Sequence, residues 1–172
     1  METSRKKALE IMQRGIVTYH LLCDKWDVSD HFGDGCDLIA EKADRYIKIE
    51  LKAIDLKSIR SGNNATQSVS ANEMVTATHL IITVFKGIEM KGNYILSMRQ
   101  FVEKSGVKKY CPFKCFEDFI KKYKKLVEAQ SQKVKNSGHK KSRLDFDFSF
   151  NPIKIEKWKL AQFKGHLEYL EL

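Results

Sequence analysis

The stretch RYIKIELKAI, residues 45–54, decides the fold, because it reads as an uninterrupted β-strand. Apolar and polar side chains alternate along it, and no glycine or proline intervenes. Residues two apart in a strand point to the same face, so Glu50 and Lys52 project together while the apolar residues between them can face a core. The strand therefore presents a carboxylate and an ammonium side by side.

Helices and further strands are expected on both sides of this segment. A helix over residues 4–22 has Ser4 as its cap and one apolar stripe formed by Leu9, Met12, Ile16 and Tyr19. Glycines at 33 and 35 separate two short strands, and residues 57–69 are polar enough to form a loop. The other expected elements are strands at 26–32, 36–41, 80–85 and 94–97, a helix within 70–79 and a short helix at 99–104. Helices and strands that intermix in this way predict an α/β or α+β fold.

The last third of the chain combines amphipathic segments with a basic tract. Residues 116–128 predict an amphipathic helix, and residues 129–143 have little apolar content, which favours a basic loop. Alternation over 144–150 predicts a strand with one buried face, and a final helix is expected from about Glu156.

Composition limits the class of protein. The chain has 172 residues, of which 42% are hydrophobic, enough for a core in one or two domains. Its apolar runs fall far short of the ~20 residues of a membrane helix, so we expect no spanning segment, and the polar N-terminus shows no secretory signal. Four cysteines are too few for a disulfide framework. These features favour a reduced, cytoplasmic setting.

The positive charge is concentrated in the second part of the chain. Residues 1–60 hold 11 basic and 11 acidic side chains, so the whole net charge of +9 arises after them. Residues 104–143 alone hold 13 basic groups and three acidic ones. Such a field suits a polyanion, either a nucleic acid or an anionic membrane surface. A solvated, lysine-rich helix face is the alternative reading of the same residues.

A hairpin register brings a second carboxylate to Glu50. If residues 42–45 form the turn, paired residue numbers sum to 87 and Asp37 lies opposite Glu50. Two carboxylates this close repel, and a hard divalent cation such as Mg²⁺ between them removes that repulsion. A shift of one residue would turn Asp37 to the other face.

The Glu-x-Lys spacing carries little information by itself. With 12 Glu and 25 Lys in the chain, chance predicts roughly two such triplets, and there are two. The second, Glu89 and Lys91, falls between Gly87 and Gly92, where we expect a turn and a solvated pair. The first is distinguished by its strand, by the upstream Asp37 and by the helix ahead of both.

That arrangement resembles the PD-(D/E)XK nuclease superfamily, in the style of archaeal Holliday-junction resolvases, Mrr-like enzymes and intron-encoded endonucleases. The stretches WDVS at 26–29, GDGCDLI at 33–39 and YIKIELK at 46–52 carry the resemblance, which covers roughly residues 5–100. It implies a restriction-endonuclease-like mixed central sheet flanked by helices. The nuclease-like core would be residues 1–104, and residues 105–172 would form a basic, helical C-terminal extension on the same domain.

The resemblance also implies residue roles. Asp37, Glu50 and the Leu51 carbonyl would bind Mg²⁺ or Mn²⁺, and Lys52 would orient the attacking water. The first-helix glutamate of related enzymes is replaced in the alignment by Arg14, and Glu10, one helical turn earlier, is the substitute. Cys36 stands where a proline often precedes the aspartate. Phosphate contacts would come from the basic residues of the extension: Lys121, Lys122, Lys124, Lys125, Lys140, Lys141 and Arg143.

The resulting expectation is a metal-dependent endonuclease that hydrolyses DNA phosphodiester bonds as a homodimer without membrane contact. Branched DNA, sequence-specific duplex and RNA remain open as substrates. A catalytically weak or inactive nucleic-acid-binding protein with the same fold is one alternative, and an interaction protein with solubilising lysines is another. A zinc site formed by Cys23, Cys36, Cys111 and Cys115 is disfavoured, because their spacing lacks a matched second pair. Gln67 is a weaker candidate for supporting the site.

Overall fold

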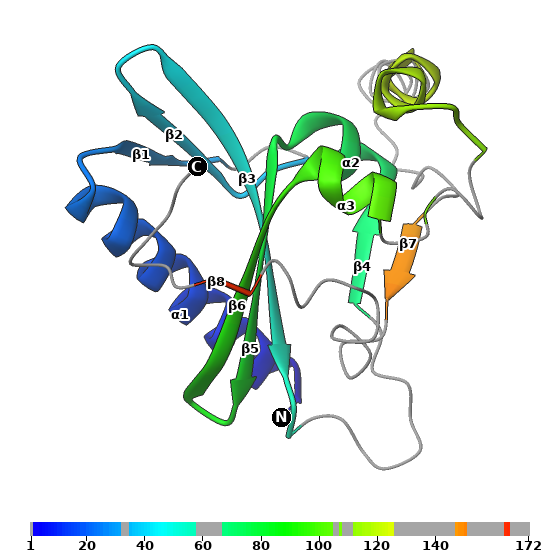
Figure 1. Cartoon of the computed structure of the whole chain (residues 1–172). Coiled ribbons are helices and arrows are strands. Elements are labelled where there is room, and N and C mark those ends of the chain that lie inside the picture. The colour runs from blue at the N-terminus through cyan, green and yellow to red at the C-terminus, as the bar shows by residue number, and fades with distance from the viewer. Residues whose placement is uncertain are drawn as a thin grey trace, which may run out of the picture.

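The computed structural model describes residues 2–31, 35–57, 67–104, 107, 112–125, 147–150 and 164–165. Its centre is a six-stranded sheet with the order β1-β2-β3-β5-β6-β8, and a separate pair joins β4 to β7 (Figure 1). Neighbouring strands of the sheet are antiparallel except β3 and β5, which are parallel. The strands are β1 Asp27–Asp30, β2 Leu38–Lys42, β3 Arg45–Asp55, β4 Gln67–Ser70, β5 His79–Lys86, β6 Glu89–Ser97, β7 Asp147–Phe150 and β8 Lys164–Gly165.

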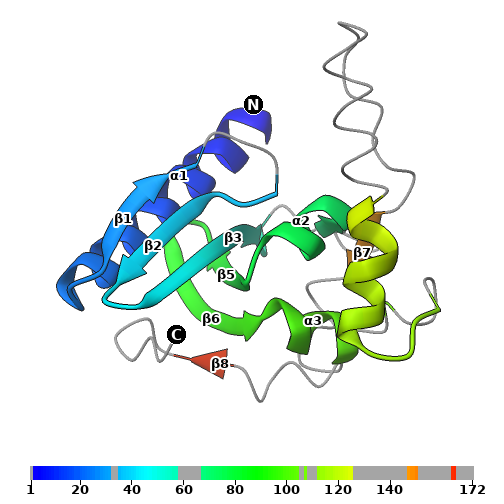
Figure 2. The same ribbon diagram turned by 90° about the horizontal axis from the view of Figure 1, so that it is seen from above.

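Helices cover both faces of this sheet (Figure 2). Helix α1, Glu2–Cys23, packs on one face, where Val17 and Leu21 contact the alternating residues of β2, β3 and β5. Helices α2, Ala71–Thr76, and α3, Met98–Lys104, lie on the other face, together with a helical segment at 116–125. The expected mixed sheet flanked by helices is therefore confirmed. Of the expected basic extension, the structure describes residues 107, 112–125, 147–150 and 164–165, and the rest lies outside the described residues.

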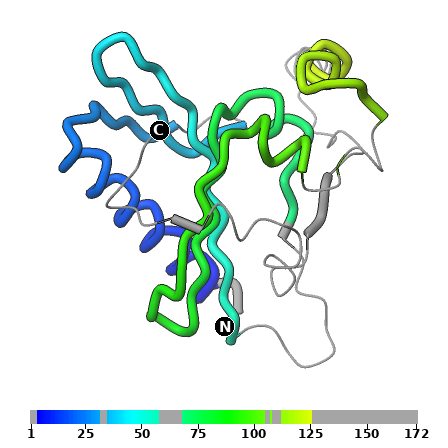
Figure 3. Tube along the Cα trace, in the orientation of Figure 1, coloured from blue at the N-terminus to red at the C-terminus, as the bar shows by residue number. Residues whose placement is uncertain are grey.

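Strand β3 has the predicted alternation and the predicted hairpin partner. The pairs run from Lys42↔Arg45 to Leu38↔Ile49, so the numbers sum to 87 as expected. Ala43, at the turn, has a positive φ of 51°. The parallel neighbour β5 requires a crossover, which the chain makes through β4 and α2 (Figure 3).

Several expectations were wrong in detail. Strand β6 begins at Glu89, directly after the turn at 87–88, so Glu89 and Lys91 lie in a strand and not in a turn. Part of the expected 57–69 loop is strand β4, which pairs with β7. Residues 164–165 lie in β8, where a helix was expected. These strands form by pairing with distant segments, which local periodicity does not report.

The stripe on α1 also differs from the prediction. Leu9, Gln13, Val17 and Leu21, four residues apart, are the buried positions, whereas Tyr19 is 64% exposed. Both the buried series and the predicted stripe follow helical spacing, so the sequence alone does not decide which of the two faces the sheet. Tertiary packing selects the buried one. Among the described residues, no helix is long and apolar enough to cross a membrane.

Candidate active site

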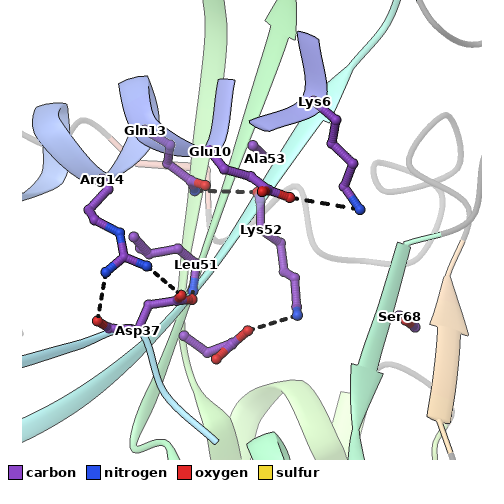
Figure 4. A pocket seen from close by; sticks show the side chains of 10 residues that line it. Lys6, Glu10, Gln13, Arg14, Asp37, Leu51, Lys52, Ala53 and Ser68 are labelled. Atoms are coloured by element: carbon purple, nitrogen blue, oxygen red, sulfur yellow. Dashed lines mark hydrogen bonds and ion pairs between the residues drawn. The ribbon is translucent and has the colours of Figure 1, made fainter. Parts of the chain in front are cut away.

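A pocket of about 250 Å³ opens beside β3 at the point where β2 begins (Figure 4). Helix α1 forms one wall, the middle of β3 forms the floor, and β4 contributes its exposed Ser68. The pocket is lined by Lys6, Glu10, Gln13, Arg14, Asp37, Glu50, Leu51, Lys52, Ala53 and Ser68. The predicted residues Asp37, Glu50, Leu51, Lys52 and Glu10 are thus brought to one cavity.

Asp37 reaches the pocket because the β2–β3 ladder stops one residue short of it. The last ladder pair is Leu38↔Ile49, and the Asp37 N–H still donates to the Ile49 carbonyl at 2.8 Å. Beyond that point the Asp37 side chain, and not the β2 backbone, provides the hydrogen-bond acceptor for β3. Its Oδ2 accepts a 2.8 Å hydrogen bond from the Leu51 N–H. In a strand, the N–H and C=O of one residue point to the same edge, so the Leu51 carbonyl also faces the Asp37 side.

Gly35 has a backbone conformation that allows the chain to pass close to α2 just before Asp37. Its φ of +99° is favoured only for glycine, and a Cβ built there would lie 2.6 Å from Thr76 Cβ on α2. The glycine two residues before Asp37 therefore lets the chain pass close to α2 before it enters β2.

Glu50 and Lys52 lie on the opposite face of β3 from α1. They pair with Leu80 and Ile82 of β5, which belong to the core beneath α2 and α3. Lys52 Nζ lies 2.7 Å from Glu50 Oε1, and only 14% and 7% of the two side chains are exposed. The predicted carboxylate–ammonium pair is therefore present and almost fully removed from solvent.

Glu73 on α2 completes an anion–cation–anion group that sequence reasoning missed. Its Oε1 lies 3.0 Å from Lys52 Nζ, and its Oε2 accepts a 2.7 Å hydrogen bond from the Ser70 N–H. Ser70 Oγ in turn accepts from the Glu73 N–H, which makes a capping box. The Ser-x-x-Glu spacing at 70–73 was the available signal for the cap, but not for the contact with Lys52.

Burial and neighbouring charges set the protonation of this group. Desolvation raises the pKa of Glu50 to about 8; the Lys52 charge opposes this shift, and the charges of Glu73 and Asp37 add to it. Burial by itself would lower the pKa of Lys52, but the charges of Glu50 and Glu73 outweigh it and raise that pKa. Lys52 therefore stays an ammonium, and a carboxylate at Glu50 is costly without further positive charge.

Arg14 occupies the side of Asp37 that faces α1. Its Nη2 donates to Asp37 Oδ1 at 2.8 Å, and its Nη1 donates to Asp30 Oδ1 at 2.8 Å. Nη1 also lies 3.2 Å from the Asp37 carbonyl. Glu10, the predicted substitute for the first-helix glutamate, lies at the pocket rim, 51% exposed, and its Oε1 is 3.7 Å from Lys6 Nζ.

Gln13 ties α1 to the floor of the pocket. Its Nε2 lies within 3.3 Å of the Lys52 carbonyl, 3.1 Å of the Ile81 carbonyl and 2.9 Å of Thr83 Oγ1. The residue is 1% exposed, and its Oε1 has no hydrogen-bond partner. Because Gln13 interrupts the apolar positions 9, 17 and 21, a buried polar role could have been suspected from the spacing.

The predicted nucleic-acid-binding residues are only partly within the described chain. Lys121, Lys122, Lys124 and Lys125 are exposed on the helical segment at 116–125, whose Phe119 is buried in the core. Lys140, Lys141 and Arg143 lie outside the described residues. The helix thus presents a lysine-rich outer face.

The cysteines show no metal site in the described part of the chain. Cys23 and Cys115 are exposed and Cys36 is buried, and all three are free thiols. No three His, Cys, Asp or Glu side chains of the described residues are grouped so that they could hold a metal ion. Cys111 and the side chain of Gln67 lie outside what the structure describes.

Comparisons with known proteins place few limits on the class. No family model matches the sequence, and no curated protein matches it. Among solved structures, the fold is similar to that of a bacterial homing endonuclease, I-Ssp6803I, with 15% sequence identity and a TM-score of 0.42. The match covers 78% of this chain and 98% of that one.

Proposed function

We propose that this chain is an endonuclease of the PD-(D/E)XK type that hydrolyses DNA phosphodiester bonds with Mg²⁺ or Mn²⁺. The observation that carries the proposal is the convergence of Asp37, Glu50 and Lys52 on one pocket, with Glu50 buried beside other carboxylates. Strongly perturbed titratable groups in a cleft are typical of catalytic sites.

The donor set fits a hydrated Mg²⁺ ion. Asp37, Glu50 and the Leu51 carbonyl offer oxygen ligands, and Mg²⁺ usually takes one or two carboxylates and keeps several waters. The raised pKa of Glu50 gives an independent argument, because a cation bound there would offset the cost of its buried charge. A bound ion would polarise the phosphate and lower the pKa of a bound water.

The chain's own residues have separate tasks in this scheme. Lys52, held between Glu50 and Glu73, is fixed in place to orient a water and to stabilise negative charge that develops at phosphorus. The lysines of the helical segment at 116–125 would contact phosphates away from the cleaved bond. Cleavage of both strands would need two such sites, so we also propose a homodimer, and branched DNA is the substrate we would test first.

One contact favours an alternative, a nucleic-acid-binding protein with this fold and little or no catalysis. Arg14 already neutralises Asp37, at the place where related enzymes carry a glutamate on the first helix. In that case the protein would bind DNA with a steep salt dependence and would not cleave it.

A cleavage assay tests the proposal. Supercoiled plasmid, a four-way DNA junction and RNA are incubated with Mg²⁺ or EDTA, using the parent chain, Glu50→Ala and Lys52→Ala. We expect metal-dependent cleavage that falls by about 10³-fold in both variants. Glu89→Ala and Lys91→Ala are the matched controls, because they remove the same residue types from an exposed pair. Equal cleavage by all the variants would contradict the proposal, and binding without cleavage by the parent would favour the alternative.

A further inference from the structure

Arg14 and a divalent cation would compete for the same atom. Of the two carboxylate oxygens of Asp37, Oδ2 accepts from the Leu51 N–H and Oδ1 accepts from the Arg14 guanidinium. A cation that binds Asp37 through Oδ1 has to displace the guanidinium or share the oxygen with it. Two positive charges on one oxygen repel, so the exchange is competitive.

Asp30 gives the guanidinium a second anchor. Arg14 Nη1 is bonded to Asp30 Oδ1 on β1, and Asp30 is about half exposed outside the pocket lining. A guanidinium that leaves Asp37 therefore keeps a charged partner next to the pocket. This lowers the cost of its release, because the arginine is not left without a counter-charge.

Gln13, the residue before Arg14 on α1, is held at the same pocket. Gln13 lines the cavity, is 1% exposed, and has an unpartnered Oε1. Its Nε2 donates to the Lys52 and Ile81 carbonyls and to Thr83 Oγ1, which fixes α1 against β3 and β5, so Arg14 approaches Asp37 from a backbone that is held in place.

We infer that Arg14 is a built-in competitor of the divalent cation, which holds Asp37 in the metal-free protein and has to yield it when the cation binds. The inference rests on the proposed function and adds a residue that tunes the cation affinity of that site. Arg14 is a positioning residue here, since it acts through Asp37.

Mn²⁺ binding without nucleic acid tests the inference, followed by calorimetry or by the loss of the free Mn²⁺ paramagnetic signal. We expect Arg14→Gln to tighten Mn²⁺ binding by about two- to fivefold, the range for loss of a partly exposed ion pair. Arg14→Lys should tighten it less, and it decides the matter if Arg14→Gln does not fold. Lys42→Gln is the matched control, because it removes one positive charge and a comparably exposed ion pair at the far end of β2. It should leave Mn²⁺ affinity unchanged.

Asp37→Asn separates the two ways of failing. If Asp37→Asn abolishes Mn²⁺ binding while both Arg14 variants bind no more tightly than the parent, the inference is overturned and the proposed function stands. If Asp37→Asn and Glu50→Gln both bind Mn²⁺ as the parent does, the cation site lies elsewhere and the proposed function fails with the inference. The absence of Mn²⁺ binding in the parent and in Arg14→Gln overturns both.

Discussion

Two Glu-x-Lys pairs lie on strands of the same sheet, and they differ in almost every physical respect. Glu50 and Lys52, in β3, have side chains that are 7% and 14% exposed. Glu89 and Lys91, at the start of β6, form an ion pair with side chains that are 64% and 39% exposed. Burial raises the pKa of Glu50 to about 8, whereas a hydrogen bond from Lys91 and its charge lower the pKa of Glu89. The Glu-x-Lys spacing is the same in both pairs, so the opposite pKa shifts of the two glutamates come from burial and from neighbouring charges.

The difference has a structural cause. Strand β3 is central, with β2 and β5 on its sides and α2 over the face that carries Glu50 and Lys52. The Glu89 end of β6 follows a two-residue turn, and its first three residues are exposed to solvent. A motif of two residues becomes a candidate site only where tertiary packing removes water from it and adds a third and fourth charged group.

The largest contrast is expected when the lysines are exchanged for an apolar residue of similar length. Lys52→Met leaves Glu50 and Glu73 without their shared cation, and we expect the free energy of unfolding to fall by about 3 kcal/mol at pH 8. Lys91→Met should leave it unchanged within error, because its pair is exposed to solvent. Urea unfolding measures both, and a loss of similar size in the two variants would remove the distinction between the pairs.

The next prediction concerns how the free energy of unfolding depends on pH when each glutamate is replaced by glutamine. Because the folded-state pKa of Glu50 is raised from 4.5 to about 8, its protonated form contributes stability that is present below pH 4.5 and lost as pH rises through about 8. Relative to the parent in EDTA, Glu50→Gln should gain about 2 kcal/mol between about pH 6.5 and pH 8.5. Thermal unfolding across this range measures the gain.

Glu89→Gln should change in the opposite direction. The pKa of Glu89 is lowered, so its ion pair contributes above the ordinary value of 4.5 and loses its contribution as pH falls below it. The variant should therefore match the parent in acid and fall slightly below it at neutral pH. A parallel pH profile for Glu50→Gln and Glu89→Gln would show that the two carboxyls share one environment.

Much of the pocket follows from local sequence, because β3 alternates without interruption and the hairpin is short. The register that places Asp37 beside Leu51 depends only on a turn at Ala43 and Asp44, and that turn is present. Local patterns also predict the helix before these strands, although its buried face differs from the predicted one, whereas the mixed sheet was implied by the family resemblance.

The features that the sequence did not predict depend on contacts between segments that are distant in the chain. Glu73 reaches Lys52 across 21 positions, and Arg14 reaches Asp37 across 23. Strand β4 exists through its pairing with β7, about 80 residues later. No periodicity within one element reports such contacts, since they depend on how α1 and α2 pack against the sheet.

The smallest expected effect concerns Glu73, the second carboxylate in contact with Lys52. Glu73→Gln keeps an oxygen that can accept from the Ser70 N–H, so the capping box survives while the second negative charge on Lys52 disappears. We expect cleavage to fall by about tenfold in kcat, with little change in stability, if Glu73 holds Lys52 in place.

Ser70→Ala is the matched control for Glu73→Gln. It removes the hydroxyl that caps α2 and should cost about 1 kcal/mol in unfolding free energy, while the Glu73 contact with Lys52 is kept. Single-turnover cleavage and urea unfolding of both variants distinguish the two roles of Glu73. If Ser70→Ala reduces kcat as much as Glu73→Gln does, the position of α2 matters rather than the Glu73 charge, and Lys52 relies on Glu50 alone.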